Sequence, residues 1–490
     1  MASKGRFAVV SALAIVLFAM PGAAVAGAAA CCPAGAPQVH HFVTLSLFPP
    51  VSTNCCSPSD VTTNFALNIL GGCVGAVRGL ELGTLFNVVT YDAYGVQLVG
   101  GTNLVCRDFG GLQLAGILNR AGGNVAGAQL AALNLAGGNV AGIQLGAGNC
   151  SGGDNAVQLG AVNLVFGSTG AQIGAANYLR GSGWVQIGAV NIAGMPGETP
   201  ESGLIRREAP AKLCAVQLGG VNLAGANTGV TIGGVNFAGG DNIVQLGGAN
   251  IACGSTALQL GGFNVACGHS EPAKSWLVRE VTKRSGFQLG GVNYAGASVG
   301  AQVGAVNIAS EVRWFQLGAF NFARQSDFPV GPLNVILNGQ FRVHAFASEA
   351  ALANFELKTG GPHFYNVLGF GYHPVETARL MLGYGLGVHI PCPCPRLFVD
   401  LDAVAYRVNP TDDALGFGGL SYLGKLRVTA GWQVAPPLAI TGGLAANAWL
   451  SDSEDGSDIP FLPIPMFKST GDTNIGIWPG VALGVEFRVI

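Results

Sequence analysis

The chain has 490 residues, of which 77 are glycine and only 10% are charged, and its formal net charge is −2. Disordered segments are polar and rich in charge, so this composition excludes a largely disordered chain and indicates regular structure that satisfies the backbone. The sequence has no basic stripe, which leaves nucleic acid without support as a partner.

The N-terminus has the pattern of a signal peptide that ends at Ala26. Lys4 and Arg6 precede an apolar stretch over 7–20, and an Ala-Val-Ala cleavage site follows. The apolar stretch is shorter than the ~20 residues of a membrane-spanning helix. We therefore expect export to the outer membrane or the cell surface. A periplasmic protein, or one that is lipid-anchored through Cys31, is the alternative.

A segment rich in Cys and Pro follows over 27–62. It contains the pairs Cys31-Cys32 and Cys55-Cys56, out of 12 cysteines in the chain. An even number of cysteines in an exported protein favours structural disulfides. No Cys-x-x-Cys pair faces another and no His lies at ligand spacing, so the sequence predicts neither a metal site nor a cofactor.

One short pattern, Gln-Φ-Gly-x-x-Asn-Φ-Ala with Φ apolar, recurs from 63 to 325. Its spacing is 16 residues in the first units and 14 in most later ones, and Asn follows Gln by five residues in most units. A fixed period of this kind is typical of repeat architectures. The clean units contain Gln158, Asn163, Gln172, Asn177, Gln186, Asn191, Gln217, Asn222, Gln245, Asn250, Gln259, Asn264, Gln288, Asn293, Gln302, Asn307, Gln316 and Asn321.

The apolar residues of one unit do not keep a single strand parity. Leu218 and Val221 lie three residues apart, whereas a flat strand would place its apolar residues on one parity. Gly219-Gly220 lies at the break, where Gly permits a sharp corner. The unit is therefore predicted to be two short strands folded over a corner. Stacked units would form a narrow two-sheet solenoid with Leu, Val and Ala inside.

Equivalent Gln and Asn side chains in such a stack would form structural hydrogen-bonded ladders along the solenoid. Exposure of these amides to solvent is the alternative interpretation. A second fold also accounts for a 14-residue period. One strand of about nine residues and a turn would give up-and-down strands of a large antiparallel membrane barrel.

Two insertions at the same phase of the repeat, 195–212 and 269–284, contain most of the charge of the repeat region. Loops often bind ligands, so a binding role is one interpretation, and plain solvated loops are the other. Cys253 and Cys267 are one unit apart, so adjacent coils would place them in range of a possible disulfide.

The last part of the chain, 336–490, alternates with a period of two and is predicted to be a β-barrel-like domain. About eight segments have the length of a tilted bilayer strand, and eight strands can close a narrow antiparallel barrel. The predicted strands are 339–348, 352–359, 363–372, 379–390, 397–408, 420–434, 437–451 and 480–490.

Charged residues fall on the minority parity of these strands, which in a membrane barrel is the lumen. The predicted lumen charges are Asp400, Asp402, Lys425, Arg427, Glu486 and Arg488. Two carboxylates can divide acid and base roles, but Asp400 and Asp402 have no nucleophile or His constellation nearby in the sequence. Lumen ion pairs are therefore the preferred interpretation, and we expect no catalytic residue and no enzyme activity.

The reiterated unit, as in 142–149, resembles the surface-repeat-containing outer-membrane or envelope proteins of Gram-negative-type bacteria. The lead-in over 64–83 and the segments 363–372 and 383–387 share this resemblance, which covers about 60–490. It implies a surface or outer-membrane location without an established activity. We expect outer-membrane lipid as a partner and a structural or adhesive role toward an unknown surface ligand or envelope protein. An outer-membrane channel or transporter, with the repeats as barrel strands, is the alternative.

Overall fold

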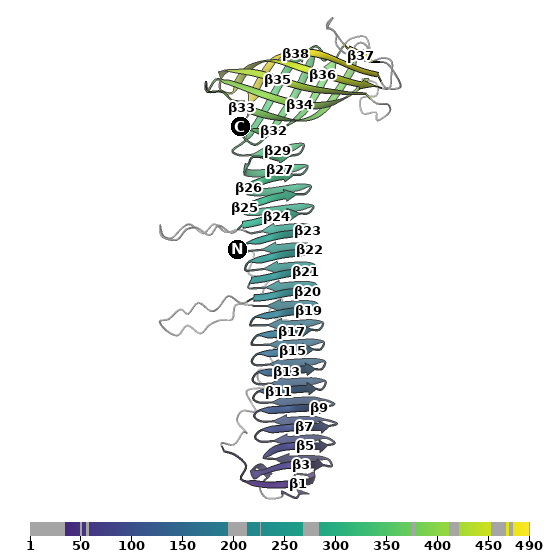
Figure 1. Ribbon diagram of the computed structural model, residues 1–490, viewed down its shortest axis with the longest axis vertical. Coiled ribbons are helices and arrows are strands. Elements are labelled where there is room, and N and C mark those ends of the chain that lie inside the picture. Colours follow the sequence, from purple (N-terminus) through teal and green to yellow (C-terminus); the bar gives the residue numbers. More distant parts are fainter. Residues whose placement is uncertain are drawn as a thin grey trace, which may run out of the picture. The chain divides into compact units, whose positions relative to one another are not determined.

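The computed structural model describes residues 35–49, 51–54, 58–194, 213–225, 227–267, 284–374, 378–410, 421–451, 467–469 and 474–489. These residues form a β-solenoid of about 17 turns and a closed eight-stranded antiparallel barrel (Figure 1). The predicted signal peptide, the two double-cysteine pairs and almost all of both insertions lie outside the described residues. Within those residues, none of the helical structure is long and apolar enough to cross a membrane.

Inter-residue contacts divide the chain into two units, 1–247 and 248–490, and the boundary falls within one solenoid strand. Apart from one short 3₁₀ helix, η2 (Pro58–Asp60), the described residues of the first unit form strands and turns. Its strands are β1 (Val39–Phe48), β2 (Val51–Ser52), β3 (Val61–Asn68), β4 (Gly71–Val74), β5 (Ala76–Gly83), β6 (Phe86–Val89), β7 (Ala93–Val99), β8 (Thr102–Val105), β9 (Phe109–Ala115), β10 (Leu118–Ala121), β11 (Val125–Leu130), β12 (Leu133–Ala136), β13 (Val140–Leu145), β14 (Gly148–Ser151), β15 (Asn155–Leu159), β16 (Val162–Val165), β17 (Thr169–Ile173), β18 (Ala176–Leu179), β19 (Gly183–Ala193), β20 (Leu213–Ala224), β21 (Asn227–Ala238) and β22 (Asn242–Ala252), which crosses the boundary.

Each coil of the first unit adds one strand to each of two parallel sheets. Strands β5, β7, β9 and β11 pair in parallel, and so do β6, β8, β10 and β12 on the other side of the corner. The pairing is in register, so that Gln113 lies opposite Gln129 and Asn119 opposite Asn134. The predicted solenoid is confirmed, and the alternative in which the repeats are antiparallel barrel strands is wrong.

The solenoid begins earlier than the predicted start of the repeats at residue 63. Strand β1 pairs in parallel with β3, from Val39 opposite Val61 to Ser46 opposite Asn68. The described part of the Cys/Pro-rich segment therefore contains a solenoid strand, although the segment has no Gln-Φ-Gly motif that identifies it in the sequence.

The inside and the outside of the coil are the reverse of the prediction for Leu and Val. Gln158 and Asn163 are fully buried, whereas Leu145, Ile173 and Val162 are each more than 40% exposed. The reversal holds beside the corner, whereas the residue two positions after Asn points inward as expected, for example Val165, Leu179 and Ala193. The reason is the corner, because its two residues reset the alternation so that Gln and Asn both point into the coil.

The interior narrows when the repeat shortens from 16 to 14 residues. In the wider coils Phe109, Val125 and Val140 fill one inward column. Asn155 and Thr169 occupy the equivalent column in the narrower coils. Apolar side chains are not confined to the wider coils, because Val299 and Val312 return to this column in 14-residue coils and Leu179 is buried in another.

The second unit contains further parallel coils and the barrel. Its solenoid strands are β23 (Thr256–Ala266), β24 (Arg284–Leu289), β25 (Val292–Val303), β26 (Val306–Leu317), β27 (Phe320–Ser326), β28 (Pro329–Val330) and β29 (Leu333–Ile336). Its barrel strands are β30 (Gln340–Ser348), β31 (Ala353–Gly360), β32 (Phe364–His373), β33 (Arg379–Pro391), β34 (Leu397–Pro410), β35 (Ser421–Ala435), β36 (Leu438–Ser451), the short β37 (Phe467–Ser469) and β38 (Asn474–Arg488).

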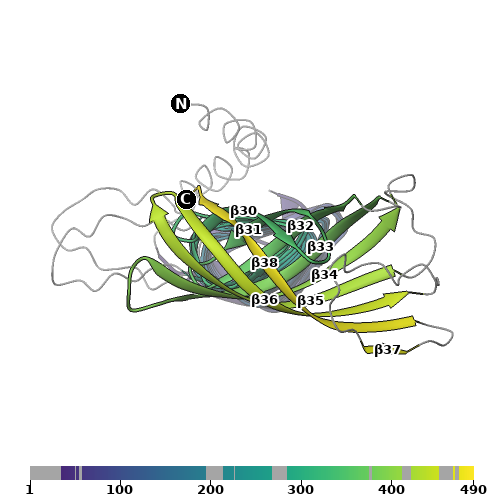
Figure 2. The same ribbon diagram turned by 90° about the horizontal axis from the view of Figure 1, so that it is seen from above.

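Eight of these barrel strands pair antiparallel with their neighbours, and β30 pairs with β38 to close the ring (Figure 2). The first seven predicted strands agree with the structure to within two residues at each end. The last strand begins at Asn474 rather than at 480. Short β37, which pairs with the start of β38, was not predicted.

The first glycine of the corner can be tested by substitution. A Cβ on Gly219 would lie 2.1 Å from the carbonyl oxygen of Gly188 and 2.6 Å from Nδ2 of Asn191. We expect Gly219→Ala to lower the free energy of unfolding by about 1–3 kcal/mol, measured by denaturant titration followed by circular dichroism.

The matched control is Gly220→Ala. The nearest atom to a Cβ on Gly220 is the carbonyl oxygen of Ala189 at 3.1 Å, and Ala occupies the equivalent position at Ala161 and Ala175. This variant should keep the wild-type midpoint. Equal midpoints for both variants would contradict the close packing of the corner.

Candidate functional site

The buried Asn residues form a ladder along the solenoid. Nδ2 of Asn134 donates to Oδ1 of Asn149 in the next coil at 2.9 Å and to the carbonyl oxygen of Leu145 at 2.9 Å. Both hydrogens of the amide are therefore used, one for the ladder and one for the backbone beside the corner. The same pair of bonds recurs at Asn163 and Asn177.

The buried Gln residues form a second ladder that runs in the opposite direction. Nε2 of Gln158 donates back to Oε1 of Gln144 at 2.8 Å and to the carbonyl oxygen of Leu164 in its own coil at 3.2 Å. Because the two ladders point in opposite directions, their side-chain dipoles oppose one another. All 18 amides predicted from the clean units are no more than 2% exposed, so the ladders are internal supports and not surface groups.

A third ladder, which the sequence interpretation missed, lies on the exposed turn before each Gln. The backbone N–H of Ser168 donates to Oδ1 of Asp154 at 2.7 Å, and that of Asp154 donates to Oδ1 of Asn139 at 2.8 Å. We call this strip of turns the polar edge. Recurrence of Asp, Asn or Ser four or five residues before Gln is the signal that identifies it.

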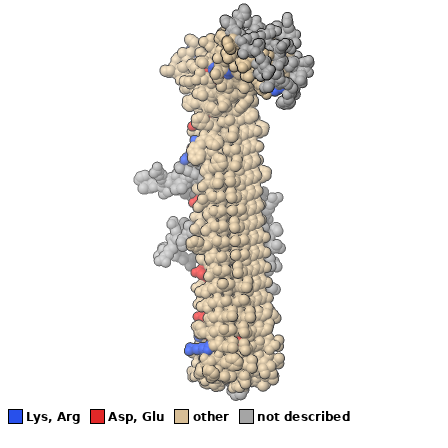
Figure 3. Space-filling view, turned by 45° about the vertical axis from the view of Figure 1, so that its right-hand side comes forward, with Lys and Arg blue, Asp and Glu red and all other residues tan. Residues whose placement is uncertain are grey.

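Both insertions leave the solenoid at the polar edge, since the described chain stops at Gly194 and Cys267 and resumes at Leu213 and Arg284. In Figure 3, the red and blue side chains of the solenoid gather along one side, and the flank turned to the viewer is nearly free of them. On the face that this view shows, charge in the solenoid is thus confined mainly to this edge.

Glu81 occupies the first rung of the Gln ladder. Its carboxylate accepts hydrogen bonds from Nε2 of Gln97 at 2.7 Å and from Nδ2 of Asn68 at 3.0 Å, and it is fully buried. Burial raises the pKa of this carboxyl from its ordinary 4.5 to about 7, against the smaller lowering by the two hydrogen bonds. Ala66, the residue opposite Glu81 in the preceding coil, has no side-chain amide, so the Gln ladder ends at Glu81.

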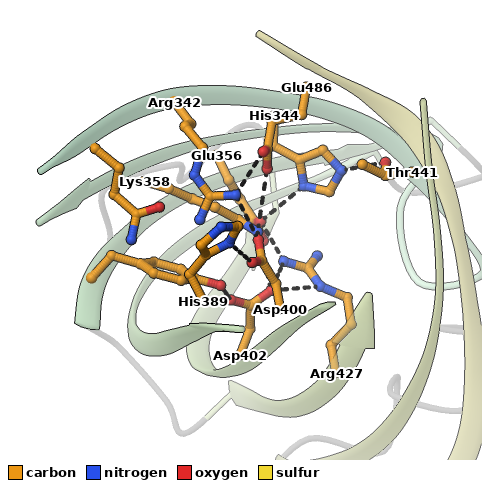
Figure 4. Close-up of polar contacts among 12 residues, drawn as sticks. Arg342, His344, Glu356, Lys358, His389, Asp400, Asp402, Arg427, Thr441 and Glu486 are labelled. Atoms are coloured by element: carbon orange, nitrogen blue, oxygen red, sulfur yellow. Dashed lines mark hydrogen bonds and ion pairs between the residues drawn. The ribbon is translucent and has the colours of Figure 1, made fainter. Parts of the chain in front are cut away.

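The barrel lumen contains a buried network of ion pairs (Figure 4). Asp400 accepts from Nη1 of Arg342 at 2.8 Å and from Nζ of Lys358 at 2.9 Å, and Nδ1 of His389 lies 2.7 Å from its other oxygen. Nη1 of Arg342 also lies 2.6 Å from Glu486. Asp400 and Glu486, both predicted lumen charges, thus share cations from β30 and β31.

Arg427 is the second centre of the network. Its guanidinium donates to Asp402 at 2.7 and 3.1 Å and also to Glu356. The hydroxyl of Tyr406 donates to Glu356 at 2.6 Å. Asp402 lies directly opposite Arg427 in the pairing of β34 with β35, so the sequence placed this pair on one parity but could not show that they touch.

The other predicted lumen residues differ from this pattern. Lys425 is buried, but it donates to Oγ of Ser348 at 3.4 Å and lies apart from the ion pairs described. Arg488 is exposed at the end of β38, where it lines the same pocket as Arg342 and Glu486, so it lies at the mouth of the lumen and outside the buried network. The reason is position along the strand, because parity sets the side of the wall and not the depth in the barrel.

Several members of the network were missed in the sequence. Arg342, His344, Glu356 and Lys358 lie on β30 and β31, and their spacing of two residues on each strand was the available signal. The other part of the lumen is apolar and contains Met381, Leu423, Trp449 and Trp478, all at most 2% exposed. Side chains thus fill the described lumen, as expected for eight strands.

Asp400 and Asp402 are held in ion pairs. The sulfur atoms of Cys253 and Cys267 are 3.4 Å apart, longer than the ~2.05 Å of a disulfide, so the possible disulfide is not formed here. Within the described ranges, no three His, Cys, Asp or Glu side chains are grouped to hold a metal.

The chain matches no family model, no curated protein and no solved structure.

Glu81 predicts a pH dependence of stability. The folded chain keeps its proton up to about pH 7, whereas the unfolded chain releases it near pH 4.5. The free energy of unfolding should therefore fall as the pH rises from about 4.5 to about 7, by up to about 3 kcal/mol, and then stay level. Urea titrations of wild type and Glu81→Gln measure this, and the variant should lack the fall. A fall of equal size in both chains would assign it to other groups.

Arg427 predicts the cost of breaking the lumen network. Arg427→Met leaves Glu356 and Asp402 buried without their shared cation, so we expect a loss of about 3–5 kcal/mol of barrel stability. The urea midpoint of the barrel in detergent micelles, followed by near-ultraviolet circular dichroism, measures it. Arg488→Met, at the exposed rim, is the control and should change the midpoint little. If both variants unfold like wild type, the network contributes no net stability.

Proposed function

We propose that this chain is a non-enzymatic outer-membrane repeat protein with a structural or adhesive role at the cell surface. The observation that carries the proposal is the inverted barrel. Asp400, Asp402 and Arg427 are buried in its interior, while Leu426 and Leu444 are 64% and 70% exposed on its outside. A soluble barrel would place these groups the other way round, whereas lipid favours apolar side chains on the outside.

Aromatic residues near both ends of the barrel support the same location. Tyr372 and Tyr422 are exposed near one end of the strands, and Trp432 and Phe487 are exposed near the other. Membrane barrels have aromatic girdles at both lipid–water interfaces. The longer strands, of 13 to 15 residues, exceed the ~9–11 that a tilted strand needs to cross a bilayer.

The filled lumen favours a structural or adhesive role over the alternative of a channel or transporter. Arg342, Lys358 and Arg427 are bonded across the interior, and Trp449 and Trp478 pack in the apolar part. The repeats stack in parallel, so they do not form the large antiparallel barrel that the channel hypothesis required. On this proposal, any partner would meet the polar edge of the solenoid, where both insertions leave it.

The proposal that the outer wall of the barrel faces lipid can be tested by placing a charge at different depths along that wall. Leu444 lies in the middle of β36, so Leu444→Arg should cost about 2–4 kcal/mol of stability in lipid vesicles, measured by urea titration of the reconstituted protein. Val489→Arg, beyond the end of β38, is the matched control and should cost about 0–1 kcal/mol. Near-neutral effects of both changes would place the wall in water and contradict the proposal.

Conductance separates the structural role from the channel. Wild-type protein reconstituted in a planar bilayer should produce no steps of current, since charged and aromatic side chains fill its lumen. Reproducible single-channel steps from protein with an intact circular dichroism spectrum would favour the channel instead.

A further inference from the structure

The flanks of the solenoid, which are the two outer surfaces on either side of the Gly corner, are apolar. In the coils from Gln129 to Ala193, the outward positions are one and four residues after Gln. Side chains there that are 36–44% exposed are Leu133, Leu145, Val162, Ile173, Ile187 and Val190. Contiguous apolar surface of this extent on a solvated protein marks a surface that something covers.

Charge is missing from these flanks. In the five coils with Gln129, Gln144, Gln158, Gln172 and Gln186, no Asp, Glu, Lys or Arg lies between the residue before Gln and the second residue after Asn. Asp154 and Arg180, which belong to the same stretch of chain, lie on the turns of the polar edge. Designed soluble surfaces have about 25–35% charged residues, so these flanks are unlike a surface in water.

The backbone of the flanks also suits lipid. Hydrogen bonds run from coil to coil through the corner, as from the N–H of Gly160 to the carbonyl of Ile173 at 3.0 Å and from that of Val162 to Ala147 at 2.9 Å. The side-chain amide of Asn163 supplies a further bond to the carbonyl of Ile173 at 2.9 Å. Lipid accepts only segments whose backbone groups are paired internally, and these bonds pair the N–H of the first corner residue and of the residue after the corner.

The boundary between flank and polar edge is marked by tryptophan. Trp184 is 75% exposed and lies two residues before Gln186, next to the edge residue Ser182. Trp314 is 62% exposed at the same position before Gln316 in the second unit. Tryptophan is enriched where lipid meets water, so its place between an apolar flank and a polar edge indicates that interface.

The depth of the flank corresponds to one leaflet. The five residues from Trp184 to the corner at Ala189 span about 16 Å at ~3.3 Å per residue. This is about half of the ~30 Å hydrocarbon core. A second copy of the chain or one protein partner would cover a single flank, whereas lipid surrounds both flanks and the corner and leaves only the polar edge in water.

We propose that the flanks of the 14- and 15-residue coils are immersed in membrane lipid, corner first and to the depth of one leaflet, with the polar edge at the aqueous boundary. This inference extends the proposed membrane location from the barrel to the solenoid and rests on that location. These coils of the solenoid would then be embedded in lipid, and the polar edge would be their exposed surface.

Tryptophan quenching by brominated lipid tests the depth. Full-length protein is reconstituted in phosphatidylcholine vesicles with bromine at carbons 6,7 or at carbons 11,12 of one acyl chain. The emission of Trp184, obtained as the difference between wild type and Trp184→Phe, should be quenched more by the bromines at carbons 6,7. The emission gained in Leu145→Trp, three positions nearer the corner, should be quenched more by the deep ones. Arg180→Trp on the polar edge is the control and should respond to aqueous iodide instead.

Trp432 on the barrel separates the two proposals. The emission of Trp432 is obtained by subtracting the spectrum of Trp432→Phe from that of wild type. If bromine quenches this emission but not that of Trp184 or of the tryptophan in Leu145→Trp, the barrel is in lipid and the solenoid inference is overturned. A dimer in gel filtration together with that result would assign the flanks to a second copy. If Trp432 is not quenched either, the membrane location itself is wrong. Wild-type circular dichroism of Leu145→Trp is required, and Trp184→Phe gives the same test with the native flanks intact.

Discussion

The tight corner of the 14-residue coil is the constraint on which the rest of the solenoid depends. The side-chain amide of Asn bonds the carbonyl of the residue before the corner of the next coil, and the inward-pointing Asn and Gln also bond their equivalents in neighbouring coils. An unpaired buried polar group would cost about 1–3 kcal/mol, and these bonds avoid that cost. The inward positions on both sides of the corner are thereby taken by amides, and the apolar residues directly beside it, such as Ile173 and Val162, are exposed.

The barrel reaches the same inverted arrangement by another interaction. Its interior is stabilised by ion pairs between strands that are distant in sequence, such as Arg342 with Glu486 and Lys358 with Asp400. Buried charges are tolerated in a low dielectric medium when they are paired, whereas the loss of one partner is costly. Polar groups inside and apolar groups outside are thus common to the solenoid coils and the barrel.

Much of the fold could be predicted from the sequence because its signals are local. The 14-residue period, the corner at Gly219-Gly220 and the alternation in the barrel strands each depend on residues within one turn or one strand. The direction in which Gln and Leu point could not be predicted in this way. Alternation shows which residues of a strand share a side, but it does not show which side faces the core. The prediction placed the more hydrophobic side inside, whereas beside the corner the Gln and Asn side chains lie inside.

The candidate site shows the same limit. Strand parity is a property of the chain, so the sequence was sufficient to assign Asp400, Asp402 and Arg427 to one side of the wall. The folded structure was needed to show that Arg342 and Lys358 meet Asp400, that Arg488 lies at the rim, and that the Gln and Asn side chains point into the solenoid. These contacts depend on the closure of the barrel and on the stacking of the coils. Both bring together residues that are distant along the chain, and no short sequence pattern shows which of them meet.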